Sequence, residues 1–504
     1  MKDKSFMFPK VSEGVKTAIL TAVSSILFFM MIVGIFNKAG SKAWLEHNPF
    51  DSYTLQAMAW RRGEAKLDKN YPHLELAIIN RPWLETHDKN DYMAYRETFG
   101  DVNAPIEHVE GNEYYVSFPP VPSVPMLLVS FFTGSKTPDN LFSILYVTGA
   151  FALAILICRR LGYGCIASLC GAVLSCAASG AVFLAANKYP GGPWFAAQTM
   201  AMLFTMAAFY TMLSKRKIGM YLAFAFLALA VGCRPFQIVY FILLAYAAAK
   251  KHDFKVLKTW RYYIAPAVIG GSYMWYNYVR FGSIFEFGHN YLPEFMRTEY
   301  SKFALENVKG NIKPYFSTFP WYKDGQLDFT RFGFAFYVSN VIFILCGLAL
   351  VLGAAYVIIR LIRERREGGQ AAPGTMQLPE LEQSLSIRKR SVFRDTYIVE
   401  ALILVVTGSI ELFLLLMHRT AGGWQFGMRY TVDIVPAALL LLGYCLRPFF
   451  VKSEIAEKAD ADSGARRIET RFIYGAKGAV IMLGALLIIF GLWLNIHGSI
   501  LMFK

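Results

Sequence analysis

The feature that most constrains the fold is a series of apolar runs, each about as long as a membrane is thick. A spanning helix needs roughly 20 mostly apolar residues, and soluble domains are only roughly 45–50% apolar. Here 55% of residues are hydrophobic and the mean hydropathy is +0.37. We therefore predict an all-α polytopic membrane protein with about eleven transmembrane helices. The predicted crossings are 16–37, 139–158, 165–186, 193–213, 218–232, 235–249, 262–281, 337–360, 395–418, 431–446 and 478–496.

Basic residues predict the orientation of these crossings. Clusters such as Arg159-Arg160, Lys215 to Lys217 and Lys250-Lys251 occur in every second short connection, whereas the alternate connections carry fewer. Positive charge is retained on the cytoplasmic side, so the pattern predicts the N-terminus inside and the C-terminus outside. The first run is longer than a signal peptide's apolar core, which indicates a retained anchor. The net charge of +15 thus reflects topology, and we exclude a nucleic-acid partner.

The same topology divides the hydrophilic loops of this single membrane domain. Loops 38–120 and 282–336 fall outside the membrane and are rich in aromatic residues and proline, so we expect them to be ordered, the first with juxtamembrane helices. Loops 363–394 and 447–477 fall in the cytoplasm. They are polar with few aromatic residues, which predicts flexible linkers. Order on the outer side indicates that function resides there.

The seven cysteines all lie in apolar runs or at their ends. This placement predicts small buried apolar residues rather than a disulfide framework or a metal site. The known metalloprotease, P-loop, nucleophile-elbow and EF-hand patterns do not occur in a fitting context.

One carboxylate follows the first apolar run. In the stretch NPFDSYTLQAMAWRRG, Asp51 precedes a segment with a helical apolar stripe that contains Tyr53, Ala57 and Trp60. The stripe predicts a short helix at the membrane interface with its aromatic residues toward lipid. Asp51 has two interpretations: an ionised group with a chemical role above the bilayer, or an N-cap of this helix, a position that aspartate favours.

An arginine interrupts the run between 218 and 249, which has basic clusters at both ends and therefore crosses an even number of times. Gly232 and Pro235 break it in the middle, so each half is too short to span the hydrocarbon core. Arg234 at the break is expected below the outer surface. Two interpretations remain: a clamp for an anionic lipid headgroup, or an arginine that extends back to the interface.

Two further stretches place polar residues near the outer ends of crossings. WYNYVRFGSIFEFGHNYLPEF contributes Arg280 and Glu286, and GGWQFGMRYTVDIVPAALLLL contributes Arg429 and Tyr430. We take these four residues as candidates for substrate binding, with Arg280 and Glu286 the weaker pair.

The order of these motifs resembles the GT-C superfamily of membrane glycosyltransferases, in particular a bacterial branch similar to protein mannosyltransferases and lipid A aminoarabinose transferases. FDSYTLQAMAWRRG is similar to the opening of that family's first outer loop, and VGCRPF is similar to its Arg-Pro break. SFPPVPSVPMLL resembles its Pro-Pro segment, although Ser117-Phe118 stand where relatives often have a basic residue. The resemblance spans most of the chain.

The resemblance implies a bacterial plasma-membrane enzyme that transfers a sugar from a polyprenyl-phosphate carrier to an acceptor of the cell envelope, with inversion. Asp51 then corresponds to the loop carboxylate that acts as general base or orients the acceptor or a metal. Arg234 and Arg429 would stabilise the leaving phosphate, since charge develops there. This chemistry requires no cofactor, and it is compatible with a divalent metal ion.

Two other classes of function are compatible with the sequence. A transporter or flippase of lipid-linked sugars would also need a cationic cavity, although only one broken hairpin is evident and transporters tend to have paired ones. A non-catalytic protein of envelope assembly is the third interpretation. Transfer of a labelled sugar to an acceptor separates the first class from both.

Overall fold

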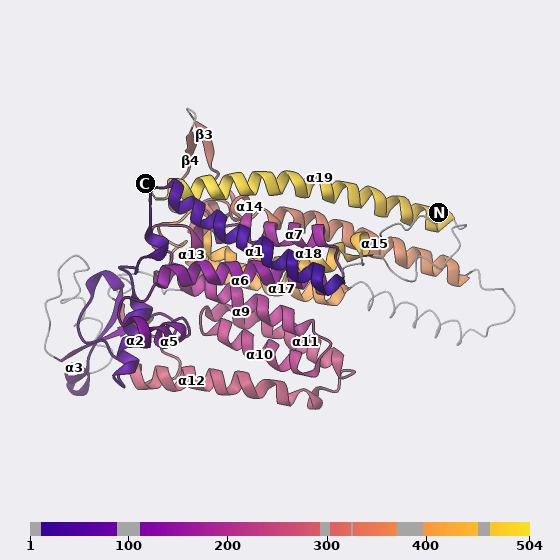
Figure 1. Cartoon of the computed structure of the whole chain (residues 1–504). Coiled ribbons are helices and arrows are strands. Elements are labelled where there is room, and N and C mark those ends of the chain that lie inside the picture. Colours follow the sequence, from indigo (N-terminus) through magenta and orange to yellow (C-terminus); the bar gives the residue numbers. More distant parts are fainter. Residues whose placement is uncertain are drawn as a thin grey trace, which may run out of the picture.

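The computed structural model of the chain describes residues 12–87, 111–292, 303–323, 326–369, 397–451 and 464–503. Within these ranges the fold is a bundle of long helices with a smaller lobe of short elements at one end (Figure 1). Helix α1 begins at the end of the bundle opposite to that at which α19 finishes. This arrangement agrees with an odd number of crossings, whose number and direction remain predictions.

Each predicted crossing contains at least one helix. Seven helical segments of the described chain are long and apolar enough to span a membrane. The chain is therefore a multi-pass helical membrane protein. The long helices are α1 (Glu13–Lys38), α6 (Asp139–Arg160), α9 (Pro193–Met212), α12 (Ile264–Phe281), α15 (Ile342–Gly369), α17 (Ile398–Met417), α18 (Val435–Phe450) and α19 (Gly464–Leu501).

The predicted crossing 165–186 is not one continuous helix. It consists of α7 (Cys165–Ala172), a π-helical turn η3 (Val173–Ala177) and α8 (Ala181–Ala185). The side-chain oxygen of Asn340 accepts a hydrogen bond from the Gly180 amide at 3.0 Å. A backbone group freed by a break in an apolar environment needs such a partner, and only the tertiary structure supplies it.

The run 218–249 is broken where the sequence predicts. Helix α10 (Lys217–Val231) ends before Gly232, and a 3-10 turn η4 (Pro235–Tyr240) leads into α11 (Phe241–Lys251). Proline cannot donate the hydrogen bond that would continue the helix. Gly232 also packs closely, because a Cβ added there would lie 2.2 Å from the Tyr273 hydroxyl. Its carbonyl accepts from the Val121 amide at 3.2 Å, which places the break beside the end lobe.

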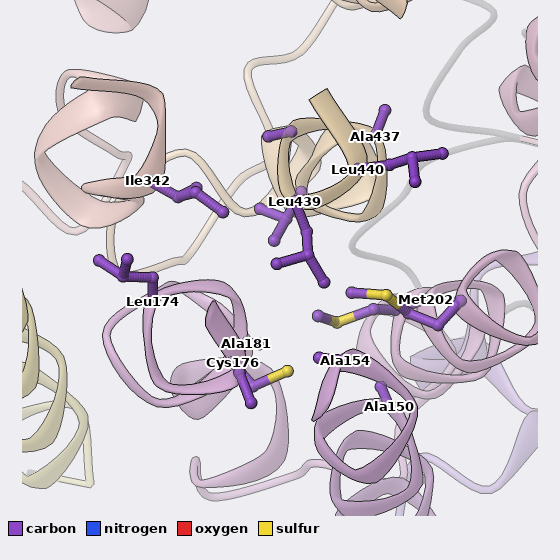
Figure 2. Packing of buried hydrophobic residues seen from close by; sticks show 14 of the residues in the cluster. Ala150, Ala154, Leu174, Cys176, Ala181, Met202, Ile342, Ala437, Leu439 and Leu440 are labelled. Carbon is purple, nitrogen blue, oxygen red and sulfur yellow. The ribbon is translucent and has the colours of Figure 1, made fainter. Parts of the chain in front are cut away.

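The centre of the bundle is packed with small and medium side chains (Figure 2). Ala150 and Ala154 of α6 and Met202 of α9 face Leu439 of α18, and all four are at most 2% exposed. Small residues let helix backbones approach closely where lipid provides no hydrophobic drive between helices. Cys176 belongs to this core, in agreement with the predicted apolar role of the cysteines; all seven are free.

The end lobe is built from the described part of loop 38–120 and from the short helix that follows it. Strands β1 (Leu76–Asn80) and β2 (Asn112–Val116) pair antiparallel, with Leu76 opposite Val116. Around them lie η1 (Ala43–Leu45), α2 (Ser52–Arg61), η2 (Pro72–Leu74), α3 (Arg81–Thr86) and α5 (Ser123–Thr133). Segment 282–339 adds η7 (His289–Tyr291), which contacts β1 of this lobe. Its other elements lie at the same end of the bundle beside α17 and α19 (Figure 1): α13 (Leu305–Phe316), β3 (Trp321–Lys323), β4 (Gln326–Asp328) and α14 (Phe336–Ser339).

The predicted orientation of α2 is wrong. Its aromatic stripe does not face lipid, because Tyr53 is 3% exposed and Ala57 is fully buried against Met126 and Ala197. The indole nitrogen of Trp60 donates a hydrogen bond to the Tyr276 hydroxyl at 3.1 Å. An apolar stripe can pack against lipid or against protein, and here α5 and α9 provide the apolar surface.

The two predicted cytoplasmic linkers are partly helical. Helix α15 continues to Gly369 and α19 begins at Gly464, so both extend into ranges expected to be flexible. An ion pair between Arg363 and Glu469 joins the extensions. The rest of these loops, 370–396 and 452–463, lies outside the described residues.

Candidate functional site

Asp51 lies in the end lobe, at the N-cap position of α2, but its side chain makes no capping hydrogen bond. Its Oδ2 accepts instead from Nε2 of His47 at 3.0 Å. The Asp51 side chain is 14% exposed. The N-cap interpretation therefore does not account for the carboxylate. Its Oδ2 forms an ion pair with His47, and its Oδ1 has no hydrogen-bond partner among the described residues.

Both ring nitrogens of His47 face hydrogen-bond acceptors, so both carry a proton. Its Nδ1 lies 3.0 Å from the carbonyl oxygen of Thr137, which only accepts, and its Nε2 faces the Asp51 carboxylate. Both nitrogens must donate, so the ring is an imidazolium. The hydrogen bond to Asp51 raises the pKa of His47 to about 9. A second carboxylate, Asp139, lies 3.7 Å from Nδ1 and is fixed by the backbone amide of Asn48 at 2.8 Å.

The two arginines of the prediction meet around one aromatic ring. The guanidinium carbons of Arg234 and Arg429 each lie 4.9 Å from the centre of the Tyr430 ring. Arg429 and Tyr430 belong to the 3-10 turn η9 (Arg429–Ile434), which precedes α18. The turn follows Gly427, whose φ is +68° and whose added Cβ would lie 2.4 Å from the side chain of Ser339. Glycine is required there for the chain to fold back.

The side chain of Arg234 is 22% exposed and pairs with a carboxylate. Its Nε donates to Oδ2 of Asp433 at 2.8 Å. The terminal guanidinium nitrogens of Arg234 have no hydrogen-bond partner among the described residues. Arg429 is 5% exposed and donates to the carbonyl oxygens of Gly422 at 3.1 Å and Trp194 at 2.8 Å. Arg234 is thus paired with Asp433, and a second buried carboxylate, Glu411, lies within electrostatic reach of both. Arg429 is held by carbonyl oxygens and has no carboxylate hydrogen-bonded to it among the described residues.

Two buried polar atoms next to these arginines have no hydrogen-bond partner in the described chain: the Tyr315 hydroxyl and Oε1 of Gln198. Tyr315 lies within electrostatic reach of Tyr430 and both arginines. The Gln198 amide nitrogen donates to the Arg429 carbonyl at 3.1 Å and to Asp433 at 3.2 Å. Buried polar groups are almost always paired, and exceptions occur where a ligand or water completes the set.

Trp194, at the start of α9, connects the two parts of the site. Its carbonyl oxygen accepts from Arg429, and its ring packs edge-on against Phe50, the neighbour of Asp51, with ring centres 5.0 Å apart. The described contacts include no direct one between Asp51 and either arginine. The carboxylate and the cations therefore flank one aromatic residue at the same end of the bundle.

Arg280 and Glu286 lie in a different part of the lobe. Arg280 is 1% exposed, and its guanidinium donates to the Val116 carbonyl at 2.7 Å and to the Asn277 side chain at 3.0 Å. Glu286 accepts from the Gly288 amide at 2.7 Å and from Asn290 at 2.6 Å. The geometry favours structural roles for both, with Arg280 tying α12 to β2.

Arg280→Ala is accordingly expected to destabilise the fold by about 2–4 kcal/mol, because it leaves a buried carbonyl unpaired and opens a cavity. The thermal unfolding midpoint in mild detergent checks this, with the exposed Arg261→Ala as control. Weaker substrate binding with an unchanged unfolding midpoint would show instead that Arg280 binds the substrate.

Sequence reasoning missed three residues of this site: His47, Asp139 and Trp194. Asp139 had a signal, since a carboxylate at the first position of an apolar run is costly and needs a reason. His47 stands four residues before Asp51, but no helix covers that spacing. Within the described ranges, no group of three or more histidine, cysteine or acidic side chains is placed to hold a metal ion.

Comparison with known proteins gives little at the level of sequence. No family model matches the chain, and no curated protein matches it. Two crystal structures of ArnT from Cupriavidus metallidurans are similar over 97% of this chain and 77% of theirs, each with 11% sequence identity. The TM-score is 0.43 for the apo state and 0.39 for the structure bound to undecaprenyl phosphate. At this level the likeness says nothing about the site residues of this chain.

Proposed function

We propose that this protein is a glycosyltransferase that moves a sugar from a polyprenyl-phosphate carrier to an acceptor on the outer side of the bacterial plasma membrane, with inversion. The observation that carries the proposal is the meeting of Arg234 and Arg429 around Tyr430, beside the lobe that holds Asp51. A lipid phosphate would enter from the bilayer and meet the cations, while an acceptor from outside would meet the carboxylate. The motif order resembling GT-C enzymes supports the same function.

The phosphate is assigned to the arginine cluster. Guanidinium groups bind phosphate through several parallel hydrogen bonds, and Arg234 has terminal nitrogens to offer. The unpartnered hydroxyl of Tyr315 supplies a further donor. As the bond between the sugar and the phosphate breaks, negative charge grows on the phosphate oxygen. Fixed positive charge in a water-poor site stabilises that charge most where it develops.

The acceptor hydroxyl is assigned to Asp51. Its Oδ2 is occupied by His47, so Oδ1 is the atom that would accept the proton when the hydroxyl oxygen attacks the anomeric carbon. The imidazolium of His47 orients the carboxylate through this hydrogen bond. Attack from the face opposite to the leaving phosphate inverts the anomeric configuration.

The test is transfer of label from a lipid-linked sugar to envelope acceptors in membranes that contain the protein. Covalent incorporation that requires the protein supports the proposal. Redistribution of the carrier across the membrane without incorporation would overturn it in favour of transport.

The dependence on pH follows from His47. Because the pKa of His47 is raised to about 9 from 6.5, the imidazolium is fully present at neutral pH and is lost as the pH rises through 9. Asp51, Asp139 and the Thr137 carbonyl all face the ring and favour the charged form. Transfer is therefore expected to fall on the alkaline side of about pH 9. In His47→Gln this alkaline decline should be absent; an identical decline in the variant would mean that another group causes it.

A further inference from the structure

Glu75 has a backbone conformation that glutamate rarely adopts. It lies between η2 and β1 with φ 53° and ψ 56°, in the left-handed region. Few non-glycine residues occupy this region, and those that do are held by their surroundings and concentrate at ligand sites. Leu74 and Leu76, at 0% and 3% exposure, anchor both sides. The hydroxyl of Ser117 donates to the Glu75 carbonyl at 3.3 Å.

The side chain of Glu75 is half-buried against the site described above. Its Oε2 accepts from the indole nitrogen of Trp194 at 3.0 Å, on the residue whose carbonyl binds Arg429. Oε1 has no hydrogen-bond partner among the described residues. Burial raises the pKa of Glu75, while the Trp194 hydrogen bond and the charge of Arg429 act in the opposite direction. One carboxylate oxygen is thus fixed, and the other is available beside the cations.

A carboxylate in this position does not bind phosphate, because the two anions repel each other. It can accept hydrogen bonds from hydroxyl groups or pair with an ammonium group. Trp194, Phe50 and Phe118 provide aromatic surface next to it, with ring centres 5.0 Å and 6.5 Å from Trp194. Sugars present hydroxyl edges and apolar faces, and both kinds of contact are available here.

The geometry points to Glu75 as the residue that recognises the sugar of the donor and restricts it to neutral or amino sugars. This inference rests on the proposed function. With the carrier phosphate between the arginines, the attached sugar lies beside Trp194 and meets Oε1 of Glu75. A sugar acid would bring a second carboxylate against Glu75, and like-charge contact in a half-buried site opposes its binding.

The experiment measures the affinities of three probes for the full-length protein in mild detergent: undecaprenyl phosphate, its glucosyl ester and its glucuronosyl ester. Wild-type protein should prefer the glucosyl over the glucuronosyl probe by roughly tenfold or more, and Glu75→Gln should remove most of this preference. Glu75→Gly should do the same without backbone strain, so a folding defect is separated from loss of the carboxylate. Glu64→Gln, an exposed residue of the same loop, is the matched control.

The outcomes separate the two proposals. If the wild type binds undecaprenyl phosphate but the preference is unchanged in both Glu75 variants, the inference about Glu75 is overturned and the proposed function stands. If affinity for all three probes falls equally, Glu75 is a structural residue and the inference is again overturned. If the wild type binds none of the probes, the proposed function itself fails.

Discussion

Asp51→Asn is expected to lower the rate of sugar transfer by roughly 100-fold or more, the usual range for loss of a positioned general base. The substitution keeps the size and shape of the side chain and removes its ability to take a proton from the acceptor. The amide oxygen of asparagine can still accept from His47, so a purely structural role of the Asp51–His47 pair predicts a lower thermal stability and an unchanged rate per amount of folded protein. The measurement is initial transfer rate per amount of folded protein in membranes.

The control for this variant is Asp68→Asn, an exposed aspartate of the same loop that contacts the Tyr71 hydroxyl at 3.1 Å. Affinity for undecaprenyl phosphate should be the same in Asp51→Asn and wild type, since the phosphate is assigned to the arginines. A transfer rate equal to that of the wild type would remove Asp51 from the chemistry.

Arg234→Gln is expected to weaken binding of undecaprenyl phosphate by roughly 30-fold or more, because it removes a charged donor from a partly buried phosphate site. The variant also leaves the Asp433 carboxylate, 1% exposed, without its partner. An unpaired buried charge is strongly destabilising and adds repulsion toward the phosphate. In the single variant, weaker phosphate binding therefore has two causes: the loss of the Arg234 donor and the unpaired charge of Asp433.

The double variant Arg234→Gln with Asp433→Asn separates these effects, because it removes both charges of the pair. It is expected to regain the thermal stability of the wild type while phosphate binding stays weak. Arg62→Gln, on an exposed arginine of the end lobe, is the control. Wild-type affinity in the double variant would show that Arg234 is only the counter-ion of Asp433.

Most of the helices could be predicted from apolar runs and basic clusters, since each crossing must pair its own backbone groups within the bilayer. The broken run around Arg234 was also predictable, because Gly232 and Pro235 are local signals. The break at Gly180 was not, because its free amide is paired by Asn340, 160 residues further along the chain. The sequence could not predict which way α2 faces, because the apolar side chain of Tyr53 packs equally well against lipid and against a neighbouring helix.

The candidate site was predictable only in part. Arg234 and Arg429 stand out because they lie at a break in an apolar run and at the end that carries few basic residues, where a charge needs a partner. Asp51 and Tyr430 stand out through their places in the motifs FDSYTLQAMAWRRG and GGWQFGMRY. His47 and Glu75 carry no such signal, since a histidine or a glutamate in a hydrophilic loop is ordinary. Trp194 stands at the end of a crossing, where tryptophan is common. Arg280 had a signal similar to that of Arg234, but its partners are a backbone carbonyl and Asn277.

The amino-acid sequence by itself determined that this chain is a bundle of membrane helices, where the run around Arg234 breaks, and which ionisable side chains stand near the ends of the runs. These properties depend on the free energy of transferring each side chain from water to lipid and on local backbone conformation. Both can be assigned to individual residues of the sequence. Only the tertiary structure decided which of these side chains meet. The pairing of Asp51 with His47, and of Arg234 with Tyr430 and Asp433, joins segments that are separated in the chain or lack regular structure, and such contacts follow from packing alone.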